Sequence, residues 1–344
     1  MLQFNLLPST LKNKYSCNGL TQEQWKAQGE PNLALGIGYI ALGVFFLTLY
    51  VPTLIVLTKK ELLKNSCYKL LIYLSLIDCM TLVCNAVITG YLTIYGHVFC
   101  SHQMLIYITG IIAMIGWTSA CFLCIVLALN RCLDIYNPVW GNFLFKGRRT
   151  IMWIITSTIY GLFMAFCTPV LLFTSREQSW AWFFDPFHGT TIIHANIDTN
   201  YINWPHTINN AVVVVGLSGL YGLFVLMLFC KFKKSNSSFK LSSFQRSLLI
   251  QTTLICSMSL IAALIYVSMN FATVDSFLII LGQLTWIMSH SSGSLTLSFC
   301  NKTIRNHIYD DFCPSVLKQY FSRQVQPNSK NLRTGNRTIT TRLA

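Results

Sequence analysis

The sequence predicts an all-α membrane protein, in which seven transmembrane helices form a bundle with the N-terminus outside and a short amphipathic helix follows the seventh span. Of the 344 residues, 53% are hydrophobic and only 10% are charged, whereas a soluble domain has about 25% charged residues. The apolar residues gather in seven long segments, and most lysines and arginines lie on alternate connections between them. Lipid is therefore the expected main solvent.

Each of the seven segments is long enough to cross the hydrocarbon core, which takes about 20 apolar residues as a helix. Asp78, in the second segment, is the one Asp, Glu, Lys or Arg residue in any of them. The alternation over about 10 residues that marks a barrel strand is absent. We place the helices at residues 33–58, 70–95, 104–129, 151–174, 207–230, 248–272 and 276–300.

The orientation follows from the positive charges, which cytoplasmic connections carry in excess. With the N-terminus outside, the outer connections hold four of the 25 lysines and arginines, and the inner connections and tail hold the other 21. The opposite orientation would reverse this bias. The formal charge of +14 therefore indicates contact with a membrane surface and no nucleic acid. We expect a multi-pass protein of the plasma membrane.

The chain divides into four parts. Residues 1–32 form an extracellular segment without the apolar stretch of a signal peptide, so the first helix is expected to act as its own insertion signal. Residues 33–300 form the seven-helix domain. Residues 301–312 place Ile304, Ile308 and Phe312 four positions apart, which predicts a helix lying on the inner leaflet; the alternative is an unstructured start to the tail. Residues 313–344 are polar and basic and are expected to be disordered.

Asp78 is the one charge expected at membrane depth, where a carboxylate costs roughly 2.5–3.5 kcal/mol. It should therefore face the bundle interior or water. One interpretation is an intramembrane polar switch linked to an ion or a proton. The other is a structural carboxyl group, satisfied by neighbours such as Ser75 or Ser294. A single acid does not supply the relay that a proton pump needs.

Asn130 and Arg131 stand where the third helix leaves the membrane on its inner side. Asp134 is three positions further along the same helix and can pair with the arginine. Arg131 could simply anchor the helix at the headgroups. The alternative is that its guanidinium group contacts a cytosolic protein, since its planar donors suit protein recognition.

Cysteines are expected to pair only where they face an oxidising compartment. Most of the 13 cysteines lie within helices or face the cytosol. Cys17 precedes the first helix and Cys100 precedes the third, so these two are the natural disulfide pair. No cysteine and histidine residues converge into a metal-ligand set.

An enzyme finds little support, because no Ser/His/Asp set or pair of carboxylates can be placed on one membrane face. No cofactor is expected, and the seventh helix lacks the lysine that a retinal Schiff base requires. Several histidines tend toward the outer side, where a metal or pH sensor is one interpretation and solvated loop residues are the other. They are His97, His102, His188, His194, His206 and His290.

Short motifs in a fixed order along most of the chain resemble the nematode serpentine receptor class T family, chemoreceptor-like relatives of rhodopsin-type receptors. The motifs run from Tyr15 to about Arg305. They are Tyr15-Ser16-Cys17, Lys59-Lys60-Glu61-Leu62, Ser66-Cys67-Tyr68-Lys69, Leu74-Ser75-Leu76-Ile77-Asp78, Ile88-Thr89-Gly90-Tyr91, Gly96 with Phe99-Cys100, Trp117, Leu127-Ala128-Leu129-Asn130-Arg131-Cys132, Trp182-Phe183-Phe184-Asp185-Pro186, Asn209-Asn210 and Asn301-Lys302-Thr303-Ile304-Arg305.

The resemblance implies a G-protein-coupled receptor. By position, Asp78 resembles the second-helix aspartate that rhodopsin-like receptors use around a sodium site, and Arg131 resembles the third-helix arginine that meets a heterotrimeric G protein. Two departures stand out. Asn130 replaces the acid that usually precedes this arginine, and Gly293 lies in the seventh helix without the Pro and Tyr of an Asn-Pro-x-x-Tyr motif. The Ser/Thr-rich tail implies an arrestin-type partner after phosphorylation; the alternative is an inert tail.

A small, mostly neutral ligand is expected between the outer halves of the helices, because cavities between helices commonly hold small molecules. The polar and aromatic residues there carry no charge, so a charged ligand would lack a buried counter-ion. For each of them, ordinary helix packing is the alternative. The candidate residues are Tyr107, Met114, Trp117, Asn209, Asn210, Tyr266, Asn270, Gln283 and Trp286.

Two other functions fit a multi-helix membrane protein. A transporter more often shows several intramembrane acids or two matched halves with broken helices. A ligand-gated channel subunit needs a pore-lining helix. Neither pattern stands out here, so the receptor is preferred.

Overall fold

The structure, a computed structural model, describes residues 10, 13–180, 184–187, 190, 201–234, 242–269 and 275–312. Within these ranges almost every regular element is helical, and a single antiparallel bridge pairs Thr174 with Ser179. The long elements are α3 (Leu33–Leu57), α4 (Ser66–Leu82) continued by η2 (Val83–Ile88) and α5 (Thr89–Ile94), α6 (Gln103–Tyr136), α8 (Arg148–Cys167), α9 (Trp204–Lys234), α10 (Ser243–Ser268) and α11 (Ser276–Leu295) continued by η5 (Thr296–Cys300).

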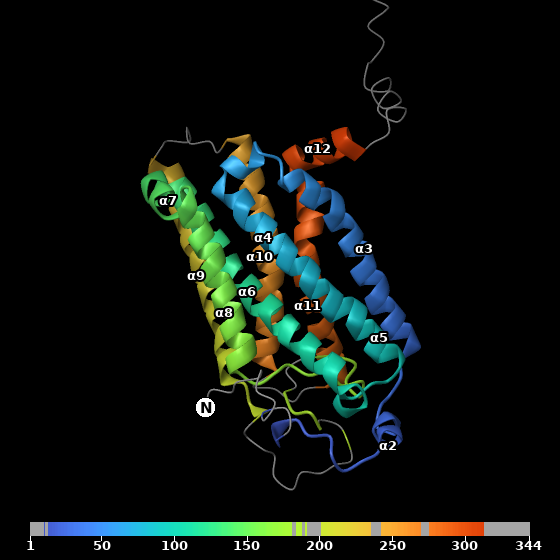
Figure 1. Ribbon diagram of the computed structural model, residues 1–344. Coiled ribbons are helices and arrows are strands. Elements are labelled where there is room, and N and C mark those ends of the chain that lie inside the picture. Colours follow the sequence, from blue (N-terminus) through green and yellow to red (C-terminus); the bar gives the residue numbers. More distant parts are fainter. Residues whose placement is uncertain are drawn as a thin grey trace, which may run out of the picture.

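These long helices run side by side as one bundle with two different ends (Figure 1). At one end lie α2 (Gln22–Ala27), η3 (Phe99–Ser101) and the segment 168–180; we call this the disulfide end. At the opposite end lie η1 (Leu62–Lys64), α7 (Pro138–Phe145) and α12 (Lys302–Phe312); we call this the α12 end. Helix α6 contacts α4, α8, α9 and α10, so it is the central helix.

Among the described residues, six helical segments are long and apolar enough to cross a membrane: Leu33–Leu57, Ser66–Ile94, Gln103–Tyr136, Arg148–Cys167, Trp204–Cys230 and Gln245–Ser268. Helix α11 is the seventh long helix but is more polar, because Gln283 and a run of serines around His290 interrupt its apolar sequence. All of these polar side chains are buried inside the bundle. A spanning helix can carry them because protein, not lipid, surrounds them.

The fourth helix is shorter than expected. It ends at Cys167 rather than near residue 174, because Pro169 cannot continue the helix and forces Thr168 into an extended conformation (φ −128°, ψ 165°). The third helix is longer than expected and ends at Tyr136. Asn137 then caps α7, with Pro138 in its first turn.

Helix α3 lies unusually close to α5 because glycines face each other at the contact. A Cβ atom on Gly36 would lie 2.7 Å from the carbonyl oxygen of Gly90, and a Cβ atom on Gly90 would likewise approach Gly36. Small residues permit such close packing of membrane helices. The π-helical η2 precedes this contact and turns the second span toward α3.

The helix expected after the seventh span is present as α12. Asn301 caps its start by accepting a hydrogen bond from the Ile304 amide at 3.1 Å. Ile304 is fully buried, Ile308 is half-buried and Phe312 is exposed. The predicted disordered tail at 313–344 lies outside the described residues.

Candidate ligand cavity and polar centre of the bundle

A cavity lies between the helices in the half of the bundle nearer the disulfide end. Four of the residues expected to bind a ligand line it, namely Met114, Trp117, Tyr266 and Trp286. His206 of α9 and Leu171 complete the lining. The cavity volume is about 10 Å³, enough for about one water molecule, whereas typical ligand pockets have roughly 300–1,000 Å³. These side chains would have to move apart to admit a ligand.

The cavity wall is aromatic. Trp117 packs edge-on against Tyr266, with ring centroids 5.6 Å apart, and His206 lies 6.4 Å from Tyr266. Trp286 is 2% exposed, and its indole N–H has no hydrogen-bond partner among the described residues. A buried donor without a partner costs free energy unless something accepts its proton. A ligand with one acceptor would complete this wall.

The two asparagines of α9 stand behind the cavity wall. The side-chain oxygen of Asn210 accepts a hydrogen bond from the Trp117 indole at 2.9 Å and another from the side-chain amide of Asn209 at 3.1 Å. Tyr160 of α8 donates to Asn209 at 3.0 Å. These hydrogen bonds join α8, α9 and α6 and fix the ring of Trp117. Asn209 and Asn210 therefore hold a cavity residue in place.

The remaining candidates are distributed around the cavity. Gln283 accepts a hydrogen bond from Ser179 at 3.0 Å and donates to the Asn85 carbonyl at 2.7 Å, so it braces the segment 168–180. Tyr107 packs edge-on against Tyr15, with centroids 5.3 Å apart, nearer the disulfide end. Asn270 lies outside the described residues.

The cavity is covered at the disulfide end. Leu171 belongs to the segment 168–180, and its carbonyl lies so close to Gly110 of α6 that a side chain on this glycine would collide with it. Tyr15 is fully buried beside this segment, and its hydroxyl accepts a hydrogen bond from the Val170 amide at 3.2 Å. Two segments far apart in the sequence thus form one cover.

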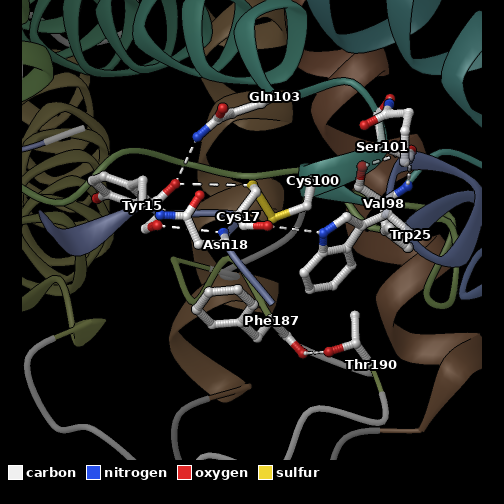
Figure 2. The surroundings of a disulfide bond; sticks show 12 residues. Tyr15, Cys17, Asn18, Trp25, Val98, Cys100, Ser101, Gln103, Phe187 and Thr190 are labelled. Carbon is white, nitrogen blue, oxygen red and sulfur yellow. Dashed lines mark hydrogen bonds between the residues drawn. A yellow bond between two sulfur atoms is a disulfide. The ribbon is translucent and has the colours of Figure 1, made fainter. Parts of the chain in front are cut away.

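A disulfide between Cys17 and Cys100 ties the N-terminal segment to the start of the third span, as expected (Figure 2). Trp25 of α2 is 2% exposed and donates its indole N–H to the Cys17 carbonyl at 3.1 Å. Its ring stacks on Phe187 at 6.0 Å. Arg176 pairs with Glu30 at 2.8 Å and links the N-terminal segment to the segment 168–180.

Two histidines lie close together at the disulfide end. The rings of His97 and His102 are 5.1 Å apart, and the His97 ring nitrogen lies 3.0 Å from the Ser101 hydroxyl. Burial, together with the smaller effect of the positive charges of His102 and Lys26, lowers the pKa of His97 to about 4. The His97 carbonyl also accepts a hydrogen bond from the Ser175 amide at 3.0 Å.

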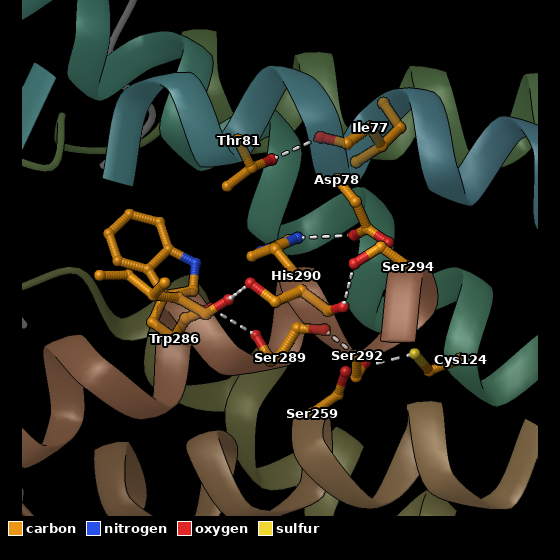
Figure 3. Close-up of polar contacts among 12 residues, drawn as sticks. Ile77, Asp78, Thr81, Cys124, Ser259, Trp286, Ser289, His290, Ser292 and Ser294 are labelled. Carbon is orange, nitrogen blue, oxygen red and sulfur yellow. Dashed lines mark hydrogen bonds and ion pairs between the residues drawn. The ribbon is translucent and has the colours of Figure 1, made fainter. Parts of the chain in front are cut away.

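Asp78 lies in a polar cluster at the middle of the bundle. The His290 ring contacts one carboxylate oxygen at 2.8 Å, and the Tyr50 hydroxyl donates to the other at 2.8 Å. Figure 3 shows His290 of α11 facing Asp78 of α4. Asp78 is 2% exposed and His290 is 1% exposed. Three helices are thereby joined through one carboxyl group.

The partners of Asp78 differ from Ser75 and Ser294, the neighbours suggested for a structural carboxyl group. Ser294 donates instead to the Ser291 carbonyl one turn earlier at 2.8 Å, as mid-helix serines commonly do. Tyr50 and His290 fill the positions around the carboxyl group. Gly293 leaves the room for this arrangement, since a Cβ atom there would lie 2.5 Å from the Tyr50 hydroxyl oxygen.

Arg131 and Asp134 form the ion pair expected at the α12 end, with 2.6 Å between the guanidinium nitrogen and the carboxylate oxygen. The Arg131 side chain is 6% exposed and that of Asp134 is 33% exposed. Arg131 also contacts the side-chain oxygen of Asn130. The three residues thus form one connected group.

Sequence reasoning missed His206 and Leu171 at the cavity and Tyr50 and His290 beside Asp78. His206 and Tyr50 carried a weak signal, because each is a polar side chain within or beside an apolar segment. Leu171 carried none, since its place depends on the early end of α8.

The chain matches the family described as serpentine type 7TM GPCR chemoreceptor Srt over residues 1–321. It is also similar to Serpentine receptor class T-55 of Caenorhabditis elegans, with 25% identity over 296 residues, which cover 85% of this chain and 78% of that receptor. The family match spans all the long helices, the cavity and the polar centre. The resemblance noted in the sequence is confirmed: this multi-pass membrane protein belongs to the Srt family of serpentine, seven-transmembrane chemoreceptors.

Proposed function

We propose that the protein is a plasma-membrane chemoreceptor that binds a small, mostly neutral molecule in the cavity bounded by Trp117, Tyr266 and Trp286. The cavity carries this proposal, because it is aromatic, lies between helices and presents one unpaired buried donor. Its lining residues include no Asp, Glu, Lys or Arg. A ligand with a permanent charge would therefore be buried without a counter-ion.

In this proposal the disulfide end faces outside and the α12 end faces the cytosol. The disulfide supports this orientation, because disulfides persist in oxidising compartments. The excess of lysine and arginine on the connections near the α12 end supports it independently. The cover formed by Tyr15 and the segment 168–180 then stands between the cavity and the extracellular solvent.

The signal leaves the protein at the α12 end, where Arg131 is released from Asp134 and contacts a heterotrimeric G protein. Arg131 is suited to this role because its guanidinium group is held by a partly exposed partner rather than a deeply buried one. The tail, once phosphorylated, recruits an arrestin-type protein. Its Ser and Thr residues lie within 313–344, outside the described residues.

The experiment is a screen of neutral volatiles, amines and organic acids against cells expressing the receptor, with G-protein recruitment as the readout. A neutral molecule with one hydrogen-bond acceptor is expected to be the strongest agonist. Flux or current without G-protein recruitment would favour the transporter or channel instead.

Trp286→Phe tests the site itself, because it keeps an aromatic ring and removes the unpaired N–H. We expect about a five- to tenfold higher half-maximal agonist concentration, the loss of one neutral hydrogen bond, with unchanged surface expression. Trp204→Phe, at the exposed start of α9, is the matched control and should change nothing. An unchanged response in Trp286→Phe would remove this side chain from the ligand site.

A further inference from the structure

A second, larger cavity opens at the α12 end and has a different character. Its volume is about 190 Å³, and it is lined mostly by polar groups from η1, α4, α6, α7 and the turn before α8. Three lysines line it: Lys64 and Lys69 are five positions apart, and Lys146 comes from a segment much further along the sequence. The fold therefore gathers positive charge around a concave site.

The positive charge in this cavity is not neutralised by the protein. None of the three lysines has an ion pair or side-chain hydrogen bond with another described residue. Asp134 also lines the cavity, but Arg131 already pairs with it at 2.6 Å. An anion that entered the site would meet three ammonium groups.

Backbone N–H groups add to this charge. Helix α4 begins at Ser66 and helix α8 begins at Arg148, so both N-termini lie at the cavity. At α4 the Asn65 side chain already accepts a hydrogen bond from the Cys67 amide at 2.8 Å. Gly147 precedes α8 with φ of +65° and provides no side-chain cap. N-termini of helices favour anions, and phosphate above all. They reinforce a site that the lysines already define.

The surroundings of the cavity indicate where the anion comes from. Helix α7 lines the cavity with Gly141 and Phe145 and exposes Val139, Trp140 and Phe143 on its other face, between 55% and 77%. Exposed aromatic and aliphatic side chains beside a basic site are typical of a helix at the lipid–water interface. A lipid headgroup would reach the lysines while its acyl chains covered this face.

We propose that the cavity lined by Lys64, Lys69 and Lys146 binds the headgroup of an anionic membrane lipid that carries phosphomonoester groups, by chemical class a polyphosphoinositide. The phosphates contact the three lysines and the two helix N-termini. The acyl chains lie against Val139, Trp140 and Phe143. The site adjoins the Arg131–Asp134 pair, so an occupied headgroup lies next to the residues proposed to meet the G protein.

The test is a binding titration of the purified receptor in detergent micelles, without any signalling readout. The probes are dioctanoyl phosphatidylinositol 4,5-bisphosphate, dioctanoyl phosphatidylinositol and soluble inositol 1,4,5-trisphosphate. The variant Lys64→Gln/Lys69→Gln/Lys146→Gln is compared with a matched control, Lys60→Gln/Lys233→Gln/Lys302→Gln, which removes three exposed lysines away from the cavity. Replacing the cavity lysines by arginine keeps the charge and checks that the site still folds.

We expect saturable binding of the bisphosphate lipid that weakens about tenfold or more in the cavity variant and changes less than about twofold in the control and in the arginine variant. Phosphatidylinositol and the soluble trisphosphate should each bind at least about tenfold more weakly. Equal losses in the cavity and control variants would overturn the proposal, because they would show only diffuse attraction. Equal binding of the soluble trisphosphate would assign the site to a free phosphate.

Discussion

The two ends of the bundle are held together by different kinds of interaction. The disulfide end is closed by a covalent bond and by fully buried aromatic rings such as Tyr15 and Trp25. The α12 end has no described disulfide. It has a partly exposed ion pair, Lys59 with Asp311 at 2.7 Å, a pair of a buried arginine with a partly exposed acid, Arg131 with Asp134 at 2.6 Å, and an open basic cavity.

This difference bears on how a signal could cross the protein. Opening the disulfide end exposes buried rings, each of which stabilises the fold by about 1.5–3 kcal/mol or more. Separating a partly exposed ion pair costs about 0–1 kcal/mol. A rearrangement started in the cavity therefore meets less resistance toward the α12 end. In the proposed function, the closed end would therefore shape the ligand site and the α12 end would move.

The largest effect is expected from breaking the disulfide. Cys17→Ser releases a constraint across 83 residues, for which loop entropy sets an upper value of about 4–5 kcal/mol. The variant should unfold at a lower temperature and reach the cell surface poorly. Cys17→Ser/Cys100→Ser should be no worse than the single change, and Cys167→Ser, at a free cysteine near the same end, should be mild. Normal melting of Cys17→Ser would contradict the comparison.

The polar centre between the two ends should give the next largest effect. Asp78→Leu leaves His290 buried without its partner, and breaking such a pair costs about 3–5 kcal/mol. Asp78→Leu/His290→Leu removes both polar groups and should recover much of that loss, although Tyr50 also loses an acceptor. Thermal unfolding of the purified variants measures this. A double variant that is less stable than Asp78→Leu would argue against the pairing.

A pH effect is expected from His97 at the disulfide end. The folded protein lowers the pKa of His97 to about 4 from an ordinary 6.5, so the unfolded chain takes up a proton first as the pH falls. The effect of His97 on the free energy of unfolding should therefore be absent above about pH 6.5, and this free energy should decline between about pH 6.5 and 4. His97→Gln should reduce the drop in melting temperature between pH 7.5 and 5, whereas His307→Gln, at the α12 end, should not. An identical drop in wild type and His97→Gln would exclude this residue as the cause.

The smallest effect on folding is expected at the Arg131–Asp134 pair. Asp134→Asn should change stability by less than about 1 kcal/mol, because Asp134 is one-third exposed. It should nevertheless raise ligand-independent G-protein recruitment by freeing Arg131. Arg131→Ala should reach the cell surface and lose recruitment. Full signalling by Arg131→Ala would leave the arginine as a membrane anchor only.

The sequence predicted the seven helices well because hydrocarbon thickness dictates their length and leaves them almost free of charge. It missed the end of the fourth helix, although Pro169 marks that end by the ordinary rule for proline. It also predicted that Met114, Trp117, Tyr266 and Trp286 lie in the same half of the bundle, where they line one cavity. Helix position and side-chain type are enough for that prediction.

Contacts between distant residues were harder to predict. Asp78 and His290 are 212 positions apart, and a single sequence does not show which faces of α4 and α11 meet. The same limit applies to the lysine-lined cavity, whose three lysines belong to η1, α4 and the turn after α7. Their charge was visible in the sequence, but their convergence depends on how the helices pack.

In the proposed function, the disulfide end receives the ligand outside the cell and the α12 end meets the G protein inside. Epitope tags at the N-terminus and after Ala344, stained in intact and permeabilised cells, test it most directly. We expect the N-terminal tag to be stained in intact cells and the C-terminal tag only after permeabilisation. Staining of the C-terminal tag alone in intact cells would contradict it.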